Sequence, residues 1–273
     1  MAESSPLIVR FLDEYERLTE KVSRCLRDYL GQPGTTQTQG LRASVRRLDA
    51  AIKVLPRRTR KSKGLKRCHE RCRDLLRETS RIRDIDIIAA RVAERSSDPT
   101  VSLILSNLKE EREEFVDNST KAAWNLLEHH PPKIGRRDIP RFARRVETVL
   151  QELDAEITSE LHACVTDETK VEELHSLRKD CKRLRYTLEL LPSLGQRAPL
   201  IGLLRSWQDV LGEIRDIDVI VDYLSKAKQT RAVRSIIAAE RAHRHARYVA
   251  FVEACRKEPR TMALSLLAPS PTR

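Results

Sequence analysis

The pentapeptide IRDID occurs twice in this chain, each time inside a longer matching segment. IRDIDIIAARV (82–92) is similar to IRDIDVIVDYL (214–224), and RASVRRLDAAIKVLP (42–56) is similar to RKDCKRLRYTLELLP (178–192). The matching segments keep the same order and nearly the same spacing, as expected of an internal duplication. The chain is therefore expected to fold as two similar halves.

Apolar residues recur three or four positions apart through nearly the whole chain, which is the period of an amphipathic helix. Aromatic residues make up only 4% of the chain, which argues against a sheet-rich fold. Asp98 followed by Pro99 is a typical helix start. The pattern predicts eight helices, seven of them at roughly residues 11–29, 41–55, 68–95, 98–129, 139–157, 174–191 and 229–257, and one that begins near Pro199.

Four helices in each half predict an all-α fold of two four-helix bundles related by a pseudo-twofold axis. We expect residues 1–132 to form the first half and residues 133–273 the second half of a single domain that spans residues 1–273. The two bundles would form one compact unit, with the equivalent basic surfaces of the halves facing a shared central cleft.

Positive charge exceeds negative charge by a wide margin. The 273 residues include 52 Lys or Arg against 40 Asp or Glu, which gives a net charge of +12 and a pI of about 9.7. Such a balance favours a polyanionic partner, which can be nucleic acid, an anionic membrane surface or a phosphate polymer.

The sequence predicts neither a membrane span nor a metal site. No run of about 18 apolar residues is present, and the acidic N-terminal segment does not resemble a secretory signal. The six cysteines fall mostly on apolar stripes, which favours free buried thiols in a cytoplasmic protein. Cys68, His69 and Cys72 invite a metal interpretation, but adjacent residues on a helix point apart and no second ligand pair is near in sequence.

The segment HSLRKDCKRLRY (175–186) places positive charge directly beside a helical apolar stripe. It contains five Lys or Arg residues, one His and one Asp. In the first half, Arg42, Arg46 and Lys53 flank the apolar stripe in the same way. Clustered like charges cost free energy unless a counter-anion neutralises them, so these stripes indicate an anion-binding surface. The alternative is an ordinary salt-bridged helix face, because several glutamates lie nearby in the sequence.

The IRDID segments carry both signs of charge. Arg83 and Arg215 are candidate anion contacts, whereas their four carboxylates accept hydrogen bonds only. These carboxylates suggest either a two-metal hydrolase or, as we favour, a structural role in which an Asp fixes a neighbouring Arg. No catalytic motif accompanies the carboxylates, which are Asp84, Asp86, Asp216 and Asp218.

HSLRKDCKRLRY is similar to the HxLRxxxKRLRY signature of the CHAD family, the conserved-histidine α-helical domain, and the LGEIRDIDVI that follows is also typical of it. The resemblance covers nearly the whole chain. It implies a pair of four-helix bundles with a basic central cleft that binds inorganic polyphosphate, without catalysis and without a cofactor. Together with their charged neighbours, the expected polyphosphate-binding residues are Arg42, Arg46, Arg47, Lys53, Arg83, His175, Arg178, Lys179, Lys182, Arg183, Arg185, Tyr186 and Arg215.

The first half departs from the family signature at two positions. Gln39 stands where the signature has histidine, and Asp49 stands where it has its final arginine. Asp49 would oppose an anion there, so we expect Asp49→Arg to tighten polyphosphate binding unless Asp49 holds Arg46 or Lys53 in place.

The leading hypothesis is a non-catalytic polyphosphate binder, and association with polyphosphate granules in the cytoplasm is one further expectation. A nucleic-acid binder is the second hypothesis. It is disfavoured because Tyr186 is the only aromatic residue beside the basic stripes that is suitably placed for base stacking. A polyphosphate-processing enzyme is the third.

Overall fold

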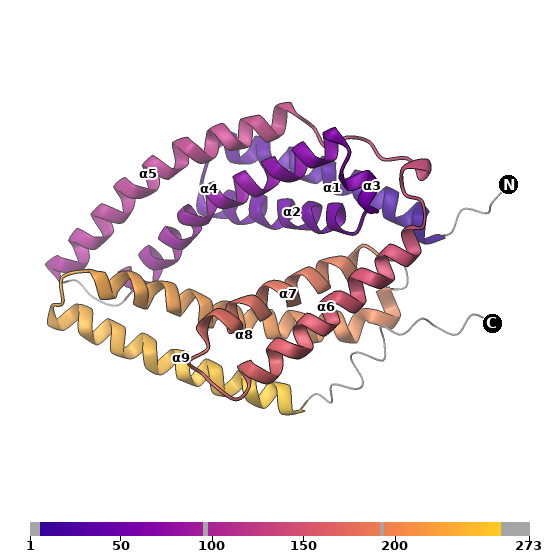
Figure 1. Cartoon of the computed structure of the whole chain (residues 1–273). Helices are drawn as coiled ribbons and strands as arrows, with labels where there is room; N and C mark the ends of the chain where they lie inside the picture. Colours follow the sequence, from indigo (N-terminus) through magenta and orange to yellow (C-terminus); the bar gives the residue numbers. More distant parts are fainter. Residues whose placement is uncertain (1–5, 95–97, 192–193, 258–273) are drawn as a thin grey trace. The chain divides into compact units, whose positions relative to one another are not determined.

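The computed structural model describes residues 6–94, 98–191 and 194–257, and within these ranges all regular secondary structure is helical (Figure 1). The predicted all-α fold is confirmed. The elements are α1 (Pro6–Gly31), α2 (Thr35–Lys53), α3 (Arg57–Arg60), α4 (Lys63–Ala93), α5 (Pro99–Glu128), the 3-10 helix η1 (Arg136–Asp138), α6 (Phe142–Cys164), α7 (Val171–Glu189), α8 (Leu194–Lys226) and α9 (Arg231–Lys257).

Helix boundaries follow local capping chemistry. The Asp98 side chain accepts a hydrogen bond of 2.8 Å from the Thr100 N–H, with Pro99 in the first turn of α5, so the predicted start is confirmed. Helix α2 begins six residues before the expected Leu41, because Thr35–Gly40 contains no proline and the buried Thr38 hydroxyl donates back to the Gly34 carbonyl at 2.8 Å.

Two further boundaries differ from the prediction. Helix α3 is an extra turn directly after Pro56, where the sequence suggested only a basic connecting stretch. Helix α8 begins at Leu194 and includes Pro199, which was expected to start it. A proline so close to a helix N-terminus removes only one backbone hydrogen bond, and the helix tolerates the loss.

The chain divides into two compact units that are not consecutive in sequence. Unit 1 takes its described residues from 6–11, 140–215 and 242–257, and unit 2 takes them from 12–139 and 216–241. The boundaries fall inside α1, α8 and α9, so these long helices contribute to both units. The division therefore differs from the halves 1–132 and 133–273 read from the repeat, and the pseudo-twofold relation stays a prediction.

Unit 2 contains a core that both IRDID segments share. Helix α4 packs against α5 and α2. Ile85 and Ile88 from the first repeat are at most 1% exposed, as are Ile220 and Leu224 from the second. Each fully buried side chain of this size contributes roughly 1.5–3 kcal/mol. The apolar positions of the motif therefore build the core, which leaves its charged positions to face outward.

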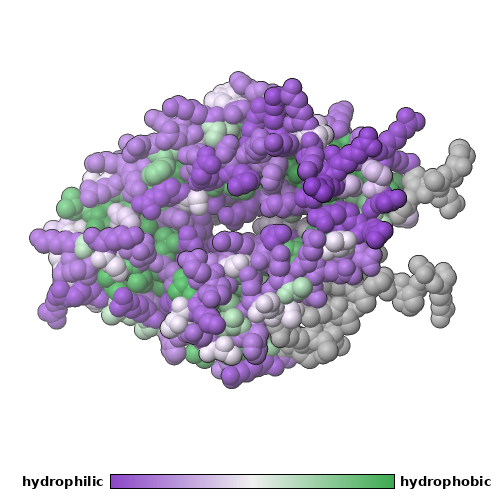
Figure 2. Space-filling view, viewed as in Figure 1, coloured by the Kyte–Doolittle hydropathy of each residue, from purple (hydrophilic) through white to green (hydrophobic). Residues whose placement is uncertain are grey.

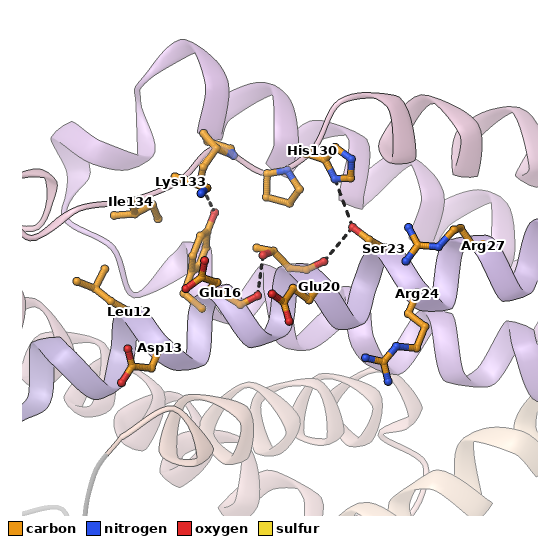
Figure 3. Close-up of a pocket in the computed structure, with 14 residues that line it drawn as sticks. Leu12, Asp13, Glu16, Glu20, Ser23, Arg24, Arg27, His130, Lys133 and Ile134 are labelled. Carbon is orange, nitrogen blue, oxygen red and sulfur yellow. Dashed lines mark hydrogen bonds between the residues drawn. The ribbon is translucent and has the colours of Figure 1, made fainter.

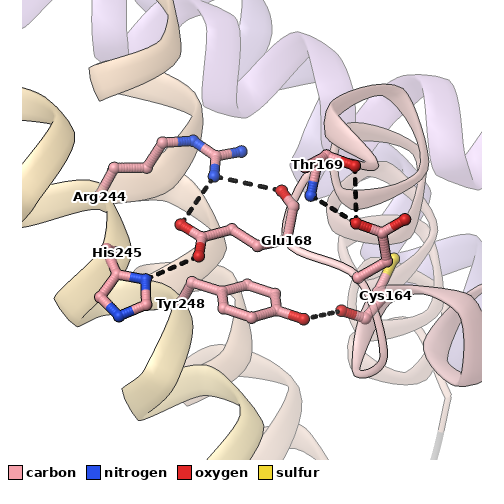
Figure 4. A network of polar contacts seen from close by, with 7 residues as sticks. Cys164, Glu168, Thr169, Arg244, His245 and Tyr248 are labelled. Atoms are coloured by element: carbon pink, nitrogen blue, oxygen red, sulfur yellow. Dashed lines mark hydrogen bonds and ion pairs between the residues drawn. The ribbon is translucent and has the colours of Figure 1, made fainter.

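Unit 1 is organised around aromatic contacts and a polar anchor on α9. The ring centroids of Phe11 and Phe142 lie 4.4 Å apart, and α6 packs against α7. Figure 4 shows the α6–α7 loop held by α9: Arg244 donates to both the backbone carbonyl and the carboxylate of Glu168, each at 3.2 Å, and the Tyr248 hydroxyl donates to the Cys164 carbonyl at 2.9 Å. These bonds fix the start of α7.

The cysteines behave as small core residues. All six are free, and Cys68, Cys72, Cys164 and Cys181 are buried. Burial raises the pKa of the Cys164 thiol to about 12, which keeps that thiol protonated and unreactive at neutral pH. Across the described residues, no helix combines the length and the apolar character needed to cross a membrane.

Candidate functional site

Helix α7 carries the strongest of the predicted basic stripes, and its amphipathic pattern folds as expected. Leu174, Leu177, Cys181, Leu184 and Leu188 are at most 1% exposed. His175, Arg178 and Lys182 beside them are half-buried, and Lys179 is exposed. The charged side chains thus lie at the border between the core and solvent, where a bound anion would be only partly hydrated.

Arg185 is the most firmly held cation of α7. Its Nε donates to Gln208 Oε1 at 2.9 Å, and its Nη1 donates to Glu189 Oε1 at 2.9 Å. Its guanidinium carbon also lies 4.7 Å from the centroid of the buried Tyr186 ring, a cation–π distance. Gln208 is itself fixed on α8, because its Nε2 donates to the Cys181 carbonyl at 3.0 Å. The geometry of Arg185 is therefore set before any ligand arrives.

Arg183 differs from its neighbours because it faces two carboxylates. Its Nη1 lies 2.6 Å from Asp180 Oδ1 and 3.2 Å from Glu156 Oε2. Asp180, the single acid of the segment 175–186, is only 7% exposed. Much of the charge of Arg183 is thus neutralised within the protein.

In the first half, Arg42 is buried, although the sequence predicted that it contacts an anion. The side chain is 5% exposed, and Nη1 donates to the Leu76 carbonyl and to Thr79 Oγ1, both at 2.7 Å. The Thr79 hydroxyl in turn donates a hydrogen bond to the Leu75 carbonyl. Arg42 therefore ties α2 to α4, and its burial argues against direct contact with a ligand. Nothing in the sequence of α2 indicates that Arg42 donates to the Thr79 hydroxyl on α4.

Asp49 is a structural partner on the same helix. Its carboxylate lies 2.6 Å from Lys53 Nζ and 2.8 Å from His69 Nδ1 on α4, and the side chain is 13% exposed. Burial alone raises the pKa of Asp49, but the hydrogen bond with His69 and the charge of Lys53 outweigh burial and hold that pKa below its usual value. Asp49 thus holds Lys53 in place, the condition under which Asp49→Arg is not expected to tighten binding.

The remaining predicted cations are half-buried. Arg46 and Arg47 lie on α2 in unit 2, and Arg215 lies on α8 in unit 1. All three have a polar or electrostatic partner in the protein. Their charges are therefore oriented by the fold.

Arg83 joins the two IRDID segments. Its Nη2 donates to Asp216 Oδ1 at 2.5 Å, and its Nη1 donates to Asp84 Oδ1 at 3.2 Å. Asp86 accepts a bond of 2.7 Å from Arg112 Nε, and Arg112 Nη2 reaches the Pro33 carbonyl before α2. Three of the four motif carboxylates therefore orient arginines.

The fourth motif carboxylate, Asp218, is half-buried and also has a partner in the protein. In the part of the chain that the structure describes, no group of three or more His, Cys, Asp or Glu side chains could hold a metal ion.

A surface cavity of about 800 Å³ is lined by none of the predicted site residues (Figure 3). It is enclosed by α1 and the linker 130–134, which the Tyr15 hydroxyl holds by donating to the Pro132 carbonyl at 3.2 Å. Its lining mixes acids with bases, namely Asp13, Glu16, Glu20, Arg24, Arg27, His130 and Lys133. The sequence gave no indication of it, because the cavity forms only where the linker folds back on α1.

Comparison with known proteins identifies the fold and the family. The sequence model of the CHAD domain matches residues 35–225, which is well over half of the chain. The chain belongs to the CHAD domain family. No curated protein sequence matches it.

Two solved structures are similar to this CHAD domain over nearly its full length. The crystal structure of the CHAD domain from the plant Ricinus communis superposes with a TM-score of 0.68 at 16% identity, covering 95% of this chain and 94% of that one. PptA from Streptomyces chartreusis superposes with a TM-score of 0.62 at 13% identity, covering 92% of this chain and 100% of that one. At such low identity the likeness shows a shared fold.

Proposed function

We propose that this CHAD domain binds inorganic polyphosphate without chemically altering it. The proposed binding residues are His175, Arg178, Lys179, Lys182 and Arg185 on α7 of unit 1, and a separate, weaker set on α2 of unit 2, namely Arg46, Arg47 and Lys53. Arg183 and Arg42 support these helices from within. A cytoplasmic location, with access to polyphosphate granules, is part of the same proposal.

The charge balance of α7 carries the proposal. Residues 175–186 include five Lys or Arg residues and one acid, and that acid is buried against Arg183. A segment with so much excess positive charge at the border of a core is stabilised by a multivalent anion. Arginine donates bidentate hydrogen bonds to phosphate oxygens, and lysine adds a compact charge.

The surroundings of Tyr186 favour a phosphate polymer over nucleic acid. Single-stranded nucleic acid is usually bound by aromatic rings on which bases stack. The ring of Tyr186 is 7% exposed and lies under the Arg185 guanidinium. Since the aromatic residue of the stripe is already covered, the surface is suited to a ligand made of phosphates alone.

The proposal of binding without hydrolysis rests on the motif carboxylates. Asp84 and Asp216 accept from Arg83, and Asp86 accepts from Arg112, so their lone pairs serve positioning. Incubation with long-chain polyphosphate and Mg²⁺ or Mn²⁺ is expected to release no phosphate above background. Turnover that Asp216→Asn abolishes would identify an enzyme instead.

A competition titration tests the choice of ligand. Labelled long-chain polyphosphate bound to the protein is challenged with unlabelled polyphosphate, single-stranded RNA and duplex DNA at equal phosphate concentration. Only unlabelled polyphosphate is expected to displace the label efficiently. Displacement by RNA or DNA at equal phosphate would contradict the proposal.

A further inference from the structure

A second basic surface lies outside the family motif, on unit 2. The segment 57–67 contains seven Lys or Arg residues and no acid, and the segment 133–138 adds three more with Asp138 as its only acid. Most of these cations are exposed. The α3 basic surface is defined here by its exposed members, which are Arg57, Arg58, Lys61, Lys63, Lys66, Arg67, Lys133, Arg136 and Arg137.

The fold brings the two segments together although they are far apart in sequence. The hydroxyl of Thr59 on α3 donates to the Asp138 backbone carbonyl of η1. Gly64 at the start of α4 packs on Pro132, where a Cβ would lie 3.4 Å from the proline Cγ. In Figure 1, α3 and the linker before α6 lie at the same end of unit 2, and in Figure 2 the surface there is mostly hydrophilic. The charges therefore form one surface.

Asp138 and Glu70 do little to neutralise this surface. The Asp138 carboxylate accepts a bond of 2.8 Å from the Gly135 N–H, which directs it into its own loop. Lys66 and Glu70 are 3.9 Å apart, with 69% and 53% of their side chains exposed, and a pair so hydrated contributes little. Lys63 and Lys66 also occupy the first turn of α4, where the helix dipole disfavours positive charge. The cluster costs stability that a bound polyanion would restore.

We propose that the α3 basic surface is a second contact for long polyphosphate chains, and this inference rests on the function proposed above. Segments 57–67 and 133–138 contain no aromatic residue for base stacking, which disfavours RNA. The exposed large apolar side chains of the described residues, Leu103, Trp124 and Val249, belong to neither segment, which disfavours insertion of these segments into a membrane. A chain of phosphates needs only cations.

The affinities of the α7 and α3 surfaces should depend differently on the length of the polyphosphate chain. Apart from the exposed Lys179, the α7 cations are half-buried, and Arg185 is held in place, so they can bind a short phosphate segment at low entropic cost. The α3 cations are exposed and flexible, so each contributes little by itself. They become effective when a polymer already bound elsewhere raises the local phosphate concentration. Within unit 2, Lys53 ends α2 four residues before Arg57, so the α2 cations and the α3 basic surface follow one another along the chain.

The test compares two triple variants with the same change in net charge. The α3 variant is Lys61→Gln, Lys63→Gln and Lys66→Gln, and the control is Lys109→Gln, Lys121→Gln and Lys228→Gln, all six lysines being exposed. At low salt the α3 variant should bind long-chain polyphosphate about tenfold more weakly, with a salt slope lower by about three. Its affinity for tripolyphosphate should equal that of the wild type. The control should match the wild type with both ligands.

The outcomes separate this inference from the proposed function. Equal losses in the α3 variant and the control would mean diffuse attraction and would overturn the inference, as would an equal loss for tripolyphosphate. A loss of RNA binding with polyphosphate binding intact would overturn it as well. If Arg178→Glu with Lys182→Glu leaves polyphosphate binding unchanged while the α3 variant weakens it, the α7 site fails and the α3 surface stands. Helical circular dichroism and thermal unfolding verify that each variant is folded.

Discussion

Helices α2 and α7 carry the same ion pair at equivalent positions of the repeat, with the charges exchanged. Asp49 and Lys53 on α2 lie 2.6 Å apart, and the aligned residues on α7, Arg185 and Glu189, lie 2.9 Å apart. Each pair joins residues one helical turn apart, where side chains on a helix meet. The two halves have kept the contact and reversed its sign.

The order of acid and base along the chain matters for the stability of each helix. An acid placed four residues before a base is the more favourable order, and a cation in the last turn favours the helix dipole. Helix α2 has both features, since Asp49 precedes Lys53 and Lys53 lies in its last turn, whereas α7 has neither. Helix α7 instead relies on Gln208 and Tyr186 to hold Arg185. This comparison favours α7 as the binding helix and α2 as the better stabilised support.

Charge reversal should produce the largest difference between α7 and α2 in its effect on polyphosphate affinity. Arg178→Glu with Lys182→Glu on α7 is expected to weaken polyphosphate binding at low salt by about a hundredfold, about 3 kcal/mol, because charge-assisted contacts turn into repulsion. Arg46→Glu with Arg47→Glu on α2 should cost about tenfold. Isothermal titration at two salt concentrations measures both.

The control for these reversals is Lys228→Glu with Arg231→Glu, a pair of exposed residues outside the basic segments of α2 and α7. It should leave the affinity nearly unchanged, since isolated exposed charges are screened by salt. Equal losses from the α2 and α7 variants would show that the two helices bind the ligand equally, and would break the comparison.

Replacing Asp49 by arginine should damage stability rather than improve binding. The change removes the contacts with Lys53 and His69 and places a second cation beside Lys53. We expect the free energy of unfolding to fall by about 2 kcal/mol, the usual cost of breaking a partly buried charged hydrogen bond. Urea denaturation followed by circular dichroism measures it.

A double variant sharpens this result. Asp49→Arg combined with Lys53→Glu recreates on α2 the order found in Arg185 and Glu189 on α7. About half of the lost stability should return, because the pair is restored while the contact with His69 is not. If Asp49→Arg alone binds polyphosphate more tightly and remains as stable as the wild type, Asp49 is only a repulsive charge and the equivalence of the two pairs has no structural meaning.

Sequence periodicity predicted the helices well, because the apolar positions of a buried stripe all lie within one helix and recur with the helical period. The stripe of α7 is buried at every predicted position. The starts of α2 and α8 were missed by six and five residues, since a threonine hydroxyl and an early proline are tolerated where simple breaker rules expect coil. The predicted halves stay a prediction, because the division into compact units depends on contacts between distant helices.

The candidate site was predictable in its charges and less so in its geometry. Motif alignment assigned Arg42 and Arg178 the same role, yet Thr79 and the Leu76 carbonyl on α4 capture Arg42 inside the protein. In the alignment Asp49 stands where the family signature has arginine, and only the structure shows its contact with His69. Partners on another helix decide whether a cation faces a ligand or the core, and one helix's sequence does not contain them.

Gln208 provides a smaller test of the same comparison. The repeat aligns Gln208 with Leu76, which offers Arg42 only its backbone carbonyl. Gln208→Leu makes the second half resemble the first by removing the acceptor of the Arg185 Nε proton. We expect a loss of about 1 kcal/mol in unfolding free energy, a typical buried hydrogen bond, and a few-fold weaker polyphosphate binding. Unchanged affinity would mean that the orientation of Arg185 does not matter for the ligand.

The smallest expected effect is the pH dependence of the α2 pair. The pKa of Asp49 is lowered from its model-peptide value of 3.8, with the hydrogen bond from His69 and the charge of Lys53 outweighing burial. A carboxylate whose folded pKa is depressed adds stability that is complete above its unfolded pKa and is lost as pH falls through the folded value. The stability that wild type has over Asp49→Asn should therefore shrink as the pH falls below about pH 4. Urea titrations across that range measure the difference. If this difference is constant down to pH 3, the charge of the Asp49 carboxylate contributes nothing to stability. The order of acid and base in the two ion pairs would then not make α2 more stable than α7.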